Sequence, residues 1–534
     1  MTDTAAGSPT LPIQPIQPIQ PIQPIQPTSL DPADPAAWEA FRDQAHRMLD
    51  DMIGHLRTLR EQPVWRPIPA ALRTRWREPL PARPVPVAEL HERFLAEVLP
   101  HAVGNAHPRF MGWVQGAGTP EGLLAEMLAA GLNANVGGRD QMPLEVERQV
   151  VHWMRELFDF PDTASGLLVT GSSTANLIGV LVARTRALGV DSRRDGLGAD
   201  GLRLVAYTSA AAHGCVAQAM AIAGLGSAAL RRVPVDTDHR IDVAALRRML
   251  AADRAAGLQP FLVVGTAGTV DVGAIDDLDA LATLCAAERL WFHVDGAFGA
   301  LARLSPALAP RLAGIERADS LALDFHKWGQ VPYDAGFVLV REQSAQLAAF
   351  ASPAAYLARH PRGLAAGSPW PCDLGPDLSR GFRALKVWFT VMAHGRERLG
   401  AAIEASCRLA RRLAERVDAD ARLQRLAPVA LNIVCLRYVG AAPDDAGGPP
   451  LDEAALDALN AELVADLHES GVAAPSTTTI GGRTAVRVAL VNHRTVEADL
   501  DLLLEALHHF GRLRLRQARV SGSGLPILSD ESSR

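Results

Sequence analysis

The sequence predicts an α/β protein built on a mostly parallel β-sheet, followed by a smaller α+β domain. In the middle of the chain, short apolar runs alternate with segments of helical periodicity, a pattern typical of parallel strands joined by crossover helices. The chain has 534 residues, enough for one large domain and at least one smaller one. Its composition, 48% hydrophobic and 21% charged, is that of a protein with a well-buried core.

The N-terminal residues cannot contribute to that core. Leu11–Pro27 repeats Pro-Ile-Gln, and a proline at every third position removes backbone donors and favours an extended polyproline conformation. We expect residues 1–34 to form a disordered leader. A docking ligand for a proline-reading domain is the alternative.

An N-terminal helical arm is expected over residues 35–110. Its first helix runs from Pro35 to about Arg60, where apolar residues recur at intervals of three and four: Trp38, Phe41, Ala45, Met48, Met52 and Leu56. An isolated helix of this kind must bury its apolar stripe against another surface, and a partner subunit is a candidate. A proline-rich passage then leads to a short helix around Val87–Val98.

The large domain is expected over residues 111–400. Its predicted strands are Gly166–Thr170, Leu204–Thr208, Phe261–Gly265, Leu290–Val294, Ser320–Asp324 and Gly336–Val340. Helices are predicted between some of these strands, at Ser173–Leu188 and Leu278–Ala287.

The smaller domain is expected over residues 401–515, with a tail at residues 516–534. After about Gly400 the pattern predicts a long helix, the strand Ala430–Tyr438, the loop Gly440–Pro450, the helix Glu453–Glu469, the strand Ala485–Val491 and the helix Val496–Phe510.

Charge and cysteine content exclude several classes of protein. The formal net charge of −6 argues against a nucleic-acid-binding protein. Five scattered cysteines without a CxxC pair predict a reducing cytosol, with neither a disulfide framework nor a metal site. No apolar run approaches the roughly 20 residues that a membrane span needs, and the N-terminus lacks the charged-then-apolar order of a secretion signal. We therefore expect a cytoplasmic enzyme with no nucleic-acid or membrane partner.

An acid and a lysine, one after the other along the chain, indicate the chemistry. Asp295 ends a strongly apolar strand, and Lys327 follows in His326-Lys327-Trp328. A lysine amine can hold the aldehyde of pyridoxal 5′-phosphate (PLP) as a Schiff base, and a carboxylate against the pyridine nitrogen keeps that nitrogen protonated. A partly desolvated Asp295 needs a cationic partner, which the pyridinium N–H supplies. The pair predicts a PLP enzyme.

A phosphate cradle is predicted in Thr170–Asn176, where a strand turns into a helix. The hydroxyls of Ser172 and Ser173, together with the N–H groups at the helix start, can hold a phosphate. Ordinary helix capping by serine is the alternative.

Further residues are candidate cofactor contacts. His213 opens a helix after a strand, where an imidazole can stack on the cofactor ring, although a histidine at such a place is most often structural. Thr269 follows a strand at the carboxyl edge of the sheet, where open α/β folds bind ligands, and an ordinary turn threonine is the alternative. Ala297 is small enough to leave room for a ring. Asp324 and His326 could each contact the phosphate or the lysine.

Several ordered segments of the chain resemble one known family, from about His107 to about Arg494. The segments are His107–Phe110, similar to its HPxF motif, Gly122–Leu128, similar to the following helix, Arg380–Trp388, similar to its RRFRxLKxW helix, and Val486–Asn492, similar to its small-domain strand. The phosphate turn, the ring-stacking histidine, the pyridine partner, the ring-packing alanine and the Schiff-base lysine of that family match Ser172 and Ser173, His213, Asp295, Ala297 and Lys327. The chain thus resembles the group II PLP-dependent amino-acid decarboxylases, the family of the aromatic-L-amino-acid and glutamate decarboxylases.

The resemblance implies PLP fold type I and a homodimer with the active site at the subunit interface. It also implies that the N-terminal arm packs on the partner. In aromatic decarboxylases a mobile loop carries a tyrosine that protonates the product carbanion, and Tyr356 lies in a similar segment. Specificity is expected to depend on pocket shape, including Trp113 near the HPxF segment.

The predicted reaction is α-decarboxylation of an L-amino acid, with an aromatic substrate favoured, through a Schiff base on Lys327. The alternatives on the same fold are decarboxylation of an acidic or diamino acid, oxidative deamination to an aldehyde, transamination, and carbon–carbon cleavage. A non-catalytic scaffold protein is a further alternative, but it would need none of Asp295, Lys327, His213 and Tyr356.

Overall fold

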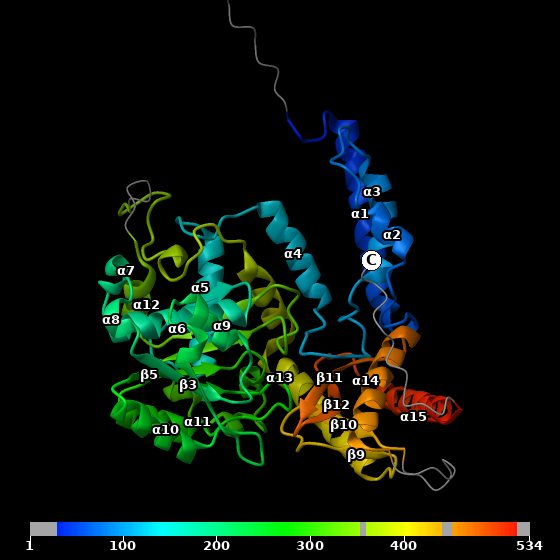
Figure 1. Cartoon of the computed structure of the whole chain (residues 1–534). Helices are drawn as coiled ribbons and strands as arrows, with labels where there is room; N and C mark the ends of the chain where they lie inside the picture. The colour runs from blue at the N-terminus through cyan, green and yellow to red at the C-terminus, as the bar shows by residue number, and fades with distance from the viewer. Residues whose placement is uncertain (1–28, 353–358, 441–450, 521–534) are drawn as a thin grey trace, which may run out of the picture. The chain divides into compact units, whose positions relative to one another are not determined.

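A seven-stranded sheet lies at the centre of the large domain (Figure 1). The structure is a computed structural model that describes residues 29–352, 359–440 and 451–520. Along the sheet the strand order is β2-β8-β7-β6-β5-β3-β4. β8 is antiparallel to β2 and β7, and the other neighbours pair in parallel. The α/β fold class with a mostly parallel sheet is therefore confirmed.

The strands of this sheet are β2 (Ser165–Val169), β3 (Leu204–Ser209), β4 (Leu230–Val233), β5 (Gln259–Thr266), β6 (Trp291–Asp295), β7 (Ser320–Asp324) and β8 (Gly336–Val340). Every strand predicted for the large domain is present, with ends that differ by a residue or two. β4 was not predicted, because this edge strand carries Arg231 and Arg232 at its centre and shows no apolar run.

Helices cover both faces of the sheet. Alternate residues of β7 point to opposite faces: Ala322 packs in a cluster with α6 (Ser172–Leu188), whereas Leu321 and Leu323 pack in a cluster with α11 (Leu278–Glu288). α9 (Cys215–Ile222) lies on the α6 face. The opposite face is covered by α5 (Met142–Leu157) and α10 (Val243–Ala255) together with α11.

A second sheet of five strands has the order β1-β11-β12-β10-β9. Its strands are β1 (Phe110–Met111), β9 (Leu423–Arg425), β10 (Ile433–Tyr438), β11 (Ala474–Ile480) and β12 (Arg483–Ala489). It shares a core with the end of α13 (Arg383–Asp418), with α14 (Glu453–Ser470) and with α15 (Glu497–Val520). β11 was not predicted, because its central residues Ser476–Thr479 form a polar run.

The long helix of this region begins earlier than predicted. α13 starts at Arg383, not after Gly400, and Gly395 interrupts it with a φ of 64°. Only glycine adopts such a backbone conformation without strain, and a glycine within a helical pattern is easily taken for its start. The last helix likewise extends past the predicted end at Phe510.

The remaining α-helices are α1 (Pro35–Arg57), α2 (Ala70–Arg75), α3 (Val87–Arg93), α4 (Pro120–Leu132), α7 (Ser192–Asp195), α8 (Gly198–Gly201) and α12 (Gln343–Phe350). α1 confirms the helix predicted from Pro35. By its internal contacts the chain divides into residues 1–52 and 53–534. The repeat at Leu11–Pro27 lies outside the described residues, and the domain boundaries drawn from the sequence stay predictions.

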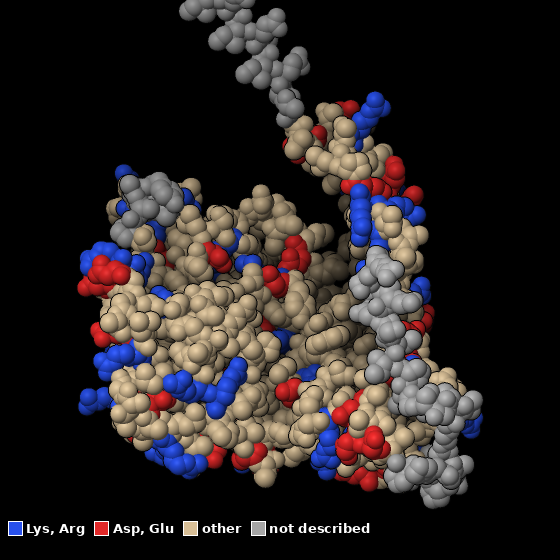
Figure 2. Space-filling view, viewed as in Figure 1, with Lys and Arg blue, Asp and Glu red and all other residues tan. Residues whose placement is uncertain are grey.

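The surface carries charges of both signs. On the face shown in Figure 2, Lys and Arg side chains alternate with Asp and Glu side chains and do not gather into one basic surface. Among the residues that the structure describes, no helix combines the length and the apolar character needed to cross a membrane.

His107 is a buried neutral histidine that ties the HPxF segment to the preceding chain. Its Nε2 donates to the carbonyl of Gln62 at 3.0 Å, and its Nδ1 accepts the backbone N–H of Arg109 at 3.0 Å. Burial, reinforced by the positive charge of Arg109, lowers the pKa of His107 to about 4.

This burial makes stability depend on pH. Between about pH 7.5 and about pH 5 the unfolded chain takes up a proton at His107 and the folded chain does not, so wild-type stability should fall by about 2 kcal/mol more than that of His107→Gln. The glutamine amide can keep both hydrogen bonds but cannot titrate. Urea unfolding of both proteins at the two pH values measures the difference, and equal losses would show that His107 is not held neutral.

Candidate active site

The residues predicted to hold the cofactor follow strands that run in the same direction. β2 is parallel to β7, because both pair antiparallel with β8, and β3, β5, β6 and β7 pair in parallel. The carboxyl ends of these strands lead to Ser172 and Ser173 after β2, His213 after β3, Thr269 after β5, Asp295 and Ala297 at β6, and His326 and Lys327 after β7. The structure therefore brings these residues to one edge of the sheet, where ligands bind in open α/β folds.

Asp295 is an acid buried at the end of β6. It is 3% exposed, and its Oδ1 accepts the backbone N–H of Ala297 at 3.2 Å. Within residues 29–352, 359–440 and 451–520, no Lys, Arg or His lies within ion-pair distance of it. A buried carboxylate without a cationic partner is unstable in its ionised form. The pyridinium N–H of PLP is a partner of the required charge, so this acid fits the cofactor.

Lys327 lies in the loop after β7, the strand that pairs with β6. The backbone N–H of Asp324 donates to the carbonyl of Ala297 at 3.0 Å, which joins the ends of β6 and β7. The Lys327 Nζ lies 2.9 Å from Asp324 Oδ2, and its side chain is 22% exposed. The amine is thus partly open to a ligand and held by one carboxylate.

The sequence contains only two lysines, Lys327 and Lys386. Lys386 lies in α13, is 4% exposed and pairs with Glu126 of α4. The lysine at the carboxyl edge of the sheet is therefore Lys327. With only two lysines in the sequence, and one of them buried in an ion pair, Lys327 is the candidate for the lysine that binds the cofactor.

Asp324 connects the lysine to the predicted phosphate turn. It is 2% exposed, and it accepts the backbone N–H of Ser172 at 2.6 Å and the Ser172 hydroxyl at 2.7 Å. Spacing along the sequence could not decide between a phosphate contact and a lysine contact for this residue. In the structure Asp324 lies against both the turn and Lys327. Ser173, the second predicted phosphate contact, is exposed at the start of α6.

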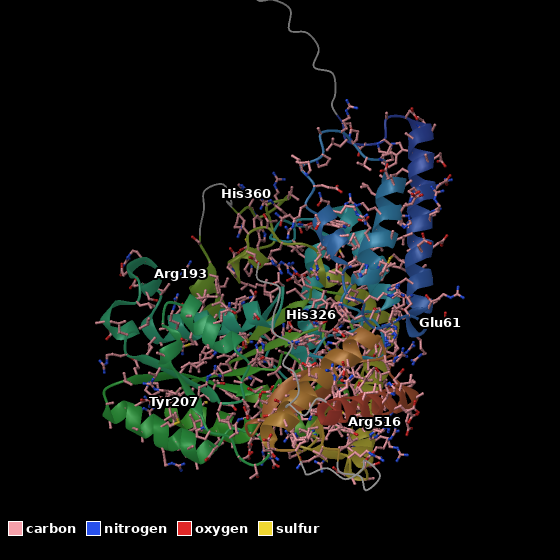
Figure 3. All side chains as sticks on the ribbon, turned by 45° about the vertical axis from the view of Figure 1, so that its right-hand side comes forward. Glu61, Arg193, Tyr207, His326, His360 and Arg516 are labelled. Atoms are coloured by element: carbon pink, nitrogen blue, oxygen red, sulfur yellow. The ribbon has the colours of Figure 1, made fainter. Side chains whose placement is uncertain are left out.

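His326 is buried beside these groups (Figure 3). Its Nδ1 accepts the backbone N–H of Ala335 at 3.0 Å, so its Nε2 carries the proton and lies 3.6 Å from Asp324 Oδ2. Burial lowers the pKa of His326. The ring of Tyr333 packs on this imidazole with centroids 4.2 Å apart. Tyr333 was not foreseen, because nothing in the sequence places it next to His326.

His213 and Thr269 are fixed by their own loops. His213 is exposed, and its Nδ1 accepts the backbone N–H of Cys215 at 3.2 Å, which holds the imidazole at the start of α9. Thr269 is fully buried, and its hydroxyl accepts the backbone N–H of Ala274 at 2.9 Å. That bond is the one expected of a turn threonine, and a cofactor contact by Thr269 stays a prediction.

Trp113 follows β1 of the five-stranded sheet and is connected to the loop that carries Thr269. Its indole is half-exposed, and its carbonyl accepts Arg487 Nη1 at 2.9 Å. Arg487 is 3% exposed and also donates to the carbonyls of Val270 and Asp271. The guanidinium thereby ties Trp113 to the β5 loop. Tyr356 lies outside the described residues.

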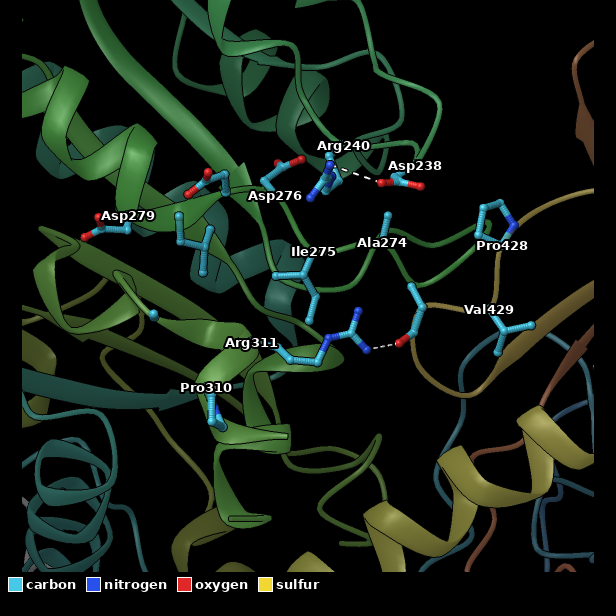
Figure 4. Close-up of a pocket in the computed structure, with 14 residues that line it drawn as sticks. Asp238, Arg240, Ala274, Ile275, Asp276, Asp279, Pro310, Arg311, Pro428 and Val429 are labelled. Atoms are coloured by element: carbon cyan, nitrogen blue, oxygen red, sulfur yellow. Dashed lines mark hydrogen bonds and ion pairs between the residues drawn. The ribbon is translucent and has the colours of Figure 1, made fainter. Parts of the chain in front are cut away.

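Away from these residues, a cavity of about 440 Å³ is lined by Asp238, Arg240, Asp276 and Arg311 among others (Figure 4). It contains none of the predicted site residues. Burial raises the pKa of Asp276 to about 6, but both of its oxygens already accept backbone N–H groups, from Ile241 and Thr266. The candidate active site is therefore the carboxyl edge of the sheet, where the predicted residues lie, and not this cavity.

Residues 69–439 match the family model described as the pyridoxal-dependent decarboxylase conserved domain. The chain belongs to this family. An aromatic-L-amino-acid decarboxylase of Bacillus atrophaeus is 32% identical over 470 residues, which cover 86% of this chain and 93% of that protein. An L-2,4-diaminobutyrate decarboxylase of Rhizobium meliloti (strain 1021) is 32% identical over 438 residues, 82% of this chain and 84% of that protein.

The fold comparison agrees with the family. The structure of Oryza sativa TDC with PLP and tryptamine matches 91% of this chain and 100% of that chain with a TM-score of 0.82, at 24% sequence identity. The predicted family, PLP fold type I, the PLP cofactor and the class of carboxy-lyase are thereby confirmed.

Proposed function

We propose that this PLP-dependent decarboxylase removes the α-carboxylate of an aromatic L-amino acid, with Lys327 and Asp295 as its central catalytic residues. The observation that carries the proposal is the burial of Asp295 without a cation, on the strand next to the one that leads to Lys327. A lysine amine and an acid without a cationic partner, at one edge of the sheet, match the aldehyde and the pyridine nitrogen of PLP, the two groups that take part in the chemistry.

Each remaining side chain has a proposed task at the cofactor. Ser173, exposed at the start of α6, would hold the phosphate together with helix N–H groups, whereas the N–H and hydroxyl of Ser172 are donated to Asp324 and would have to leave that carboxylate to reach a phosphate. His213 would lie on one face of the ring, and Ala297 leaves room on the other. When bound, PLP supplies an electron sink that stabilises the electron pair left on the substrate when carbon dioxide departs.

The protein's own groups manage charge and protons in this scheme. Asp295 would keep the pyridine nitrogen protonated, because a buried carboxylate gains from a cationic N–H partner. Lys327 Nζ would hold the cofactor's aldehyde carbon and exchange places with the substrate amine. Asp324 positions the Lys327 amine by accepting its hydrogen bond. Tyr356, or Lys327 itself, would return a proton to the substrate Cα.

The matched pair of lysines tests the Schiff-base assignment. We expect the purified holoenzyme to absorb visible light, and we expect Lys327→Ala to lose this band and most turnover. Lys386→Met keeps the buried hydrocarbon of the other lysine and should retain the band. A visible band that survives in Lys327→Ala, or that disappears in a folded Lys386→Met, would contradict the proposal.

The substrate class is proposed from the surroundings of the site. Tyr333 offers aromatic surface beside His326, and the half-exposed Trp113 is connected by its carbonyl, through Arg487, to the loop after β5. The relatives named above include an aromatic and a diaminobutyrate decarboxylase at equal identity, so a diamino acid is the second candidate.

A product screen distinguishes these substrates and the other PLP reactions. We expect kcat/KM for L-tryptophan, L-tyrosine or L-phenylalanine to exceed that for L-2,4-diaminobutyrate and L-glutamate by at least about tenfold, the effect of roughly 1.4 kcal/mol of differential binding. Amine and carbon dioxide should form in equal amounts. Faster turnover of diaminobutyrate would overturn the aromatic assignment, and hydrogen peroxide or a keto acid as the main product would overturn simple decarboxylation.

We further infer a homodimer with the active site at its interface. The outer face of α4 exposes Met127, Leu128 and Leu132, at 52%, 46% and 62%. Apolar side chains gathered in this way mark interaction surfaces, and a second copy of the chain is the partner that the family resemblance implies.

Substitution on α4 tests this interface. Sedimentation of the wild type should give about twice the mass of one chain, and Met127→Glu with Leu132→Glu should shift the protein towards the monomer. Leu202→Glu, at an exposed apolar residue outside both α4 and the N-terminal arm, is the control and should leave the mass unchanged. A wild type that sediments as a monomer at micromolar concentration would contradict the inference.

A further inference from the structure

A row of buried polar groups ends on Asp295. Its other members have no part in the functions proposed so far. It connects two strands and two helices: β6, β7, α6 and α9. The contacts are Trp291 Nε1 to Ser320 Oγ at 2.8 Å, Ser320 Oγ to His293 Nδ1 at 2.7 Å, His293 Nε2 to Asn176 Oδ1 at 2.7 Å, Asn176 Nδ2 to Cys215 Sγ at 3.4 Å, and Cys215 Sγ to Asp295 Oδ2 at 3.9 Å.

The two ends of the row, together with the amide of Asn176, fix the direction of every hydrogen bond in it. The indole N–H of Trp291 can only donate, and an ionised Asp295 can only accept. Ser320 accepts the indole hydrogen, and its own hydrogen goes to His293 Nδ1, because the single N–H of the neutral imidazole is used at Nε2 against the amide oxygen of Asn176. His293 then donates from Nε2 to the amide oxygen of Asn176. The amide N–H of Asn176 donates to Cys215, whose thiol hydrogen is left for Asp295.

The protonation states agree with this direction. His293 is fully buried, and burial lowers its pKa to about 4, so the imidazole is neutral and carries a single N–H. Burial and the negative charge of Asp295 raise the pKa of Cys215 to about 12, so the thiol keeps its hydrogen. Asn176 is 1% exposed, so its amide is shielded from bulk water.

Gly179 makes the close packing of this row possible. A Cβ at this position of α6 would lie 2.7 Å from the His293 ring. The helix backbone can therefore approach the imidazole only because residue 179 has no side chain.

We propose that this row is a one-way hydrogen-bond relay that positions Asp295, with Cys215 and Asn176 as positioning residues. The relay orients one carboxylate oxygen of Asp295. It also favours the ionised form of Asp295, because hydrogen bonds to a charged group stabilise that group. The inference rests on the proposed role of Asp295 at the pyridine nitrogen. In that role, an acid held in one orientation keeps the ring nitrogen protonated over a wider range of pH.

Four single variants separate a positioning role from a merely structural one. Cys215→Ala removes the last donor, and Cys215→Ser keeps a donor at the same place. Asn176→Asp keeps the shape of the side chain but replaces the donating N–H with an acceptor. Cys285→Ala removes another buried thiol, on α11, and serves as the matched control.

The measurement is made on holoenzyme loaded with PLP labelled with ¹⁵N in the ring. The ¹⁵N chemical shift, followed against pH, gives the pH at which the ring nitrogen loses its proton, and a fluorescence titration gives the PLP dissociation constant. We expect Cys215→Ala and Asn176→Asp to lower that pH and to weaken PLP binding about fivefold, as for the loss of one hydrogen bond. Cys215→Ser and Cys285→Ala should match the wild type.

Asp295→Ala, measured in parallel, distinguishes failure of the relay from failure of the proposed function. If it changes the ring titration while Cys215→Ala and Asn176→Asp do not, the relay is overturned and the role of Asp295 stands. If Asp295→Ala leaves the titration unchanged, the proposed role of Asp295 fails first. Should Asn176→Asp not fold, the comparison of Cys215→Ala with Cys215→Ser decides.

Discussion

An acid buried without a cation is the constraint on which the active site depends. Asp295 ends β6 inside the protein, and the described part of the chain places no basic side chain within ion-pair distance of it. Folding a charge into such a place costs free energy unless a partner is supplied. The cofactor's pyridinium is that partner in our account, so cofactor binding and folding should stabilise each other. The sheet, the relay through Cys215 and the bond from Ala297 all hold this one carboxylate.

A second carboxylate organises the other end of the site. Asp324 accepts hydrogen bonds from Ser172 and lies 2.9 Å from Lys327 Nζ, so it links the predicted phosphate turn to the lysine. Because the ends of β6 and β7 are joined through Asp324 N and the carbonyl of Ala297, the two acids are held on one rigid support. This arrangement holds the Lys327 amine and the Asp295 carboxylate in fixed positions relative to each other before the cofactor binds.

The sequence was sufficient for the fold class, the strands of the large sheet and the family. Apolar strands such as β6 and β7 are read easily because both of their faces are buried. The edge strand β4 and the polar strand β11 escaped prediction because their side chains do not show that burial. The start of α13 was misplaced because Gly395 interrupts its helical pattern. The roles of Asp324, Cys215 and Asn176 could not be predicted, since their partners lie on elements far away in the sequence. Tyr356 stays a prediction outside the described residues.

Chemical trapping tests the central assignment most directly. Borohydride reduction of the holoenzyme fixes the cofactor to the lysine that carries it, and digestion after arginine releases residues 318–341 with Lys327 and residues 384–396 with Lys386. We expect the added mass of the reduced cofactor on the peptide 318–341 alone. The same mass on the peptide that contains Lys386, or on neither peptide, would contradict the assignment.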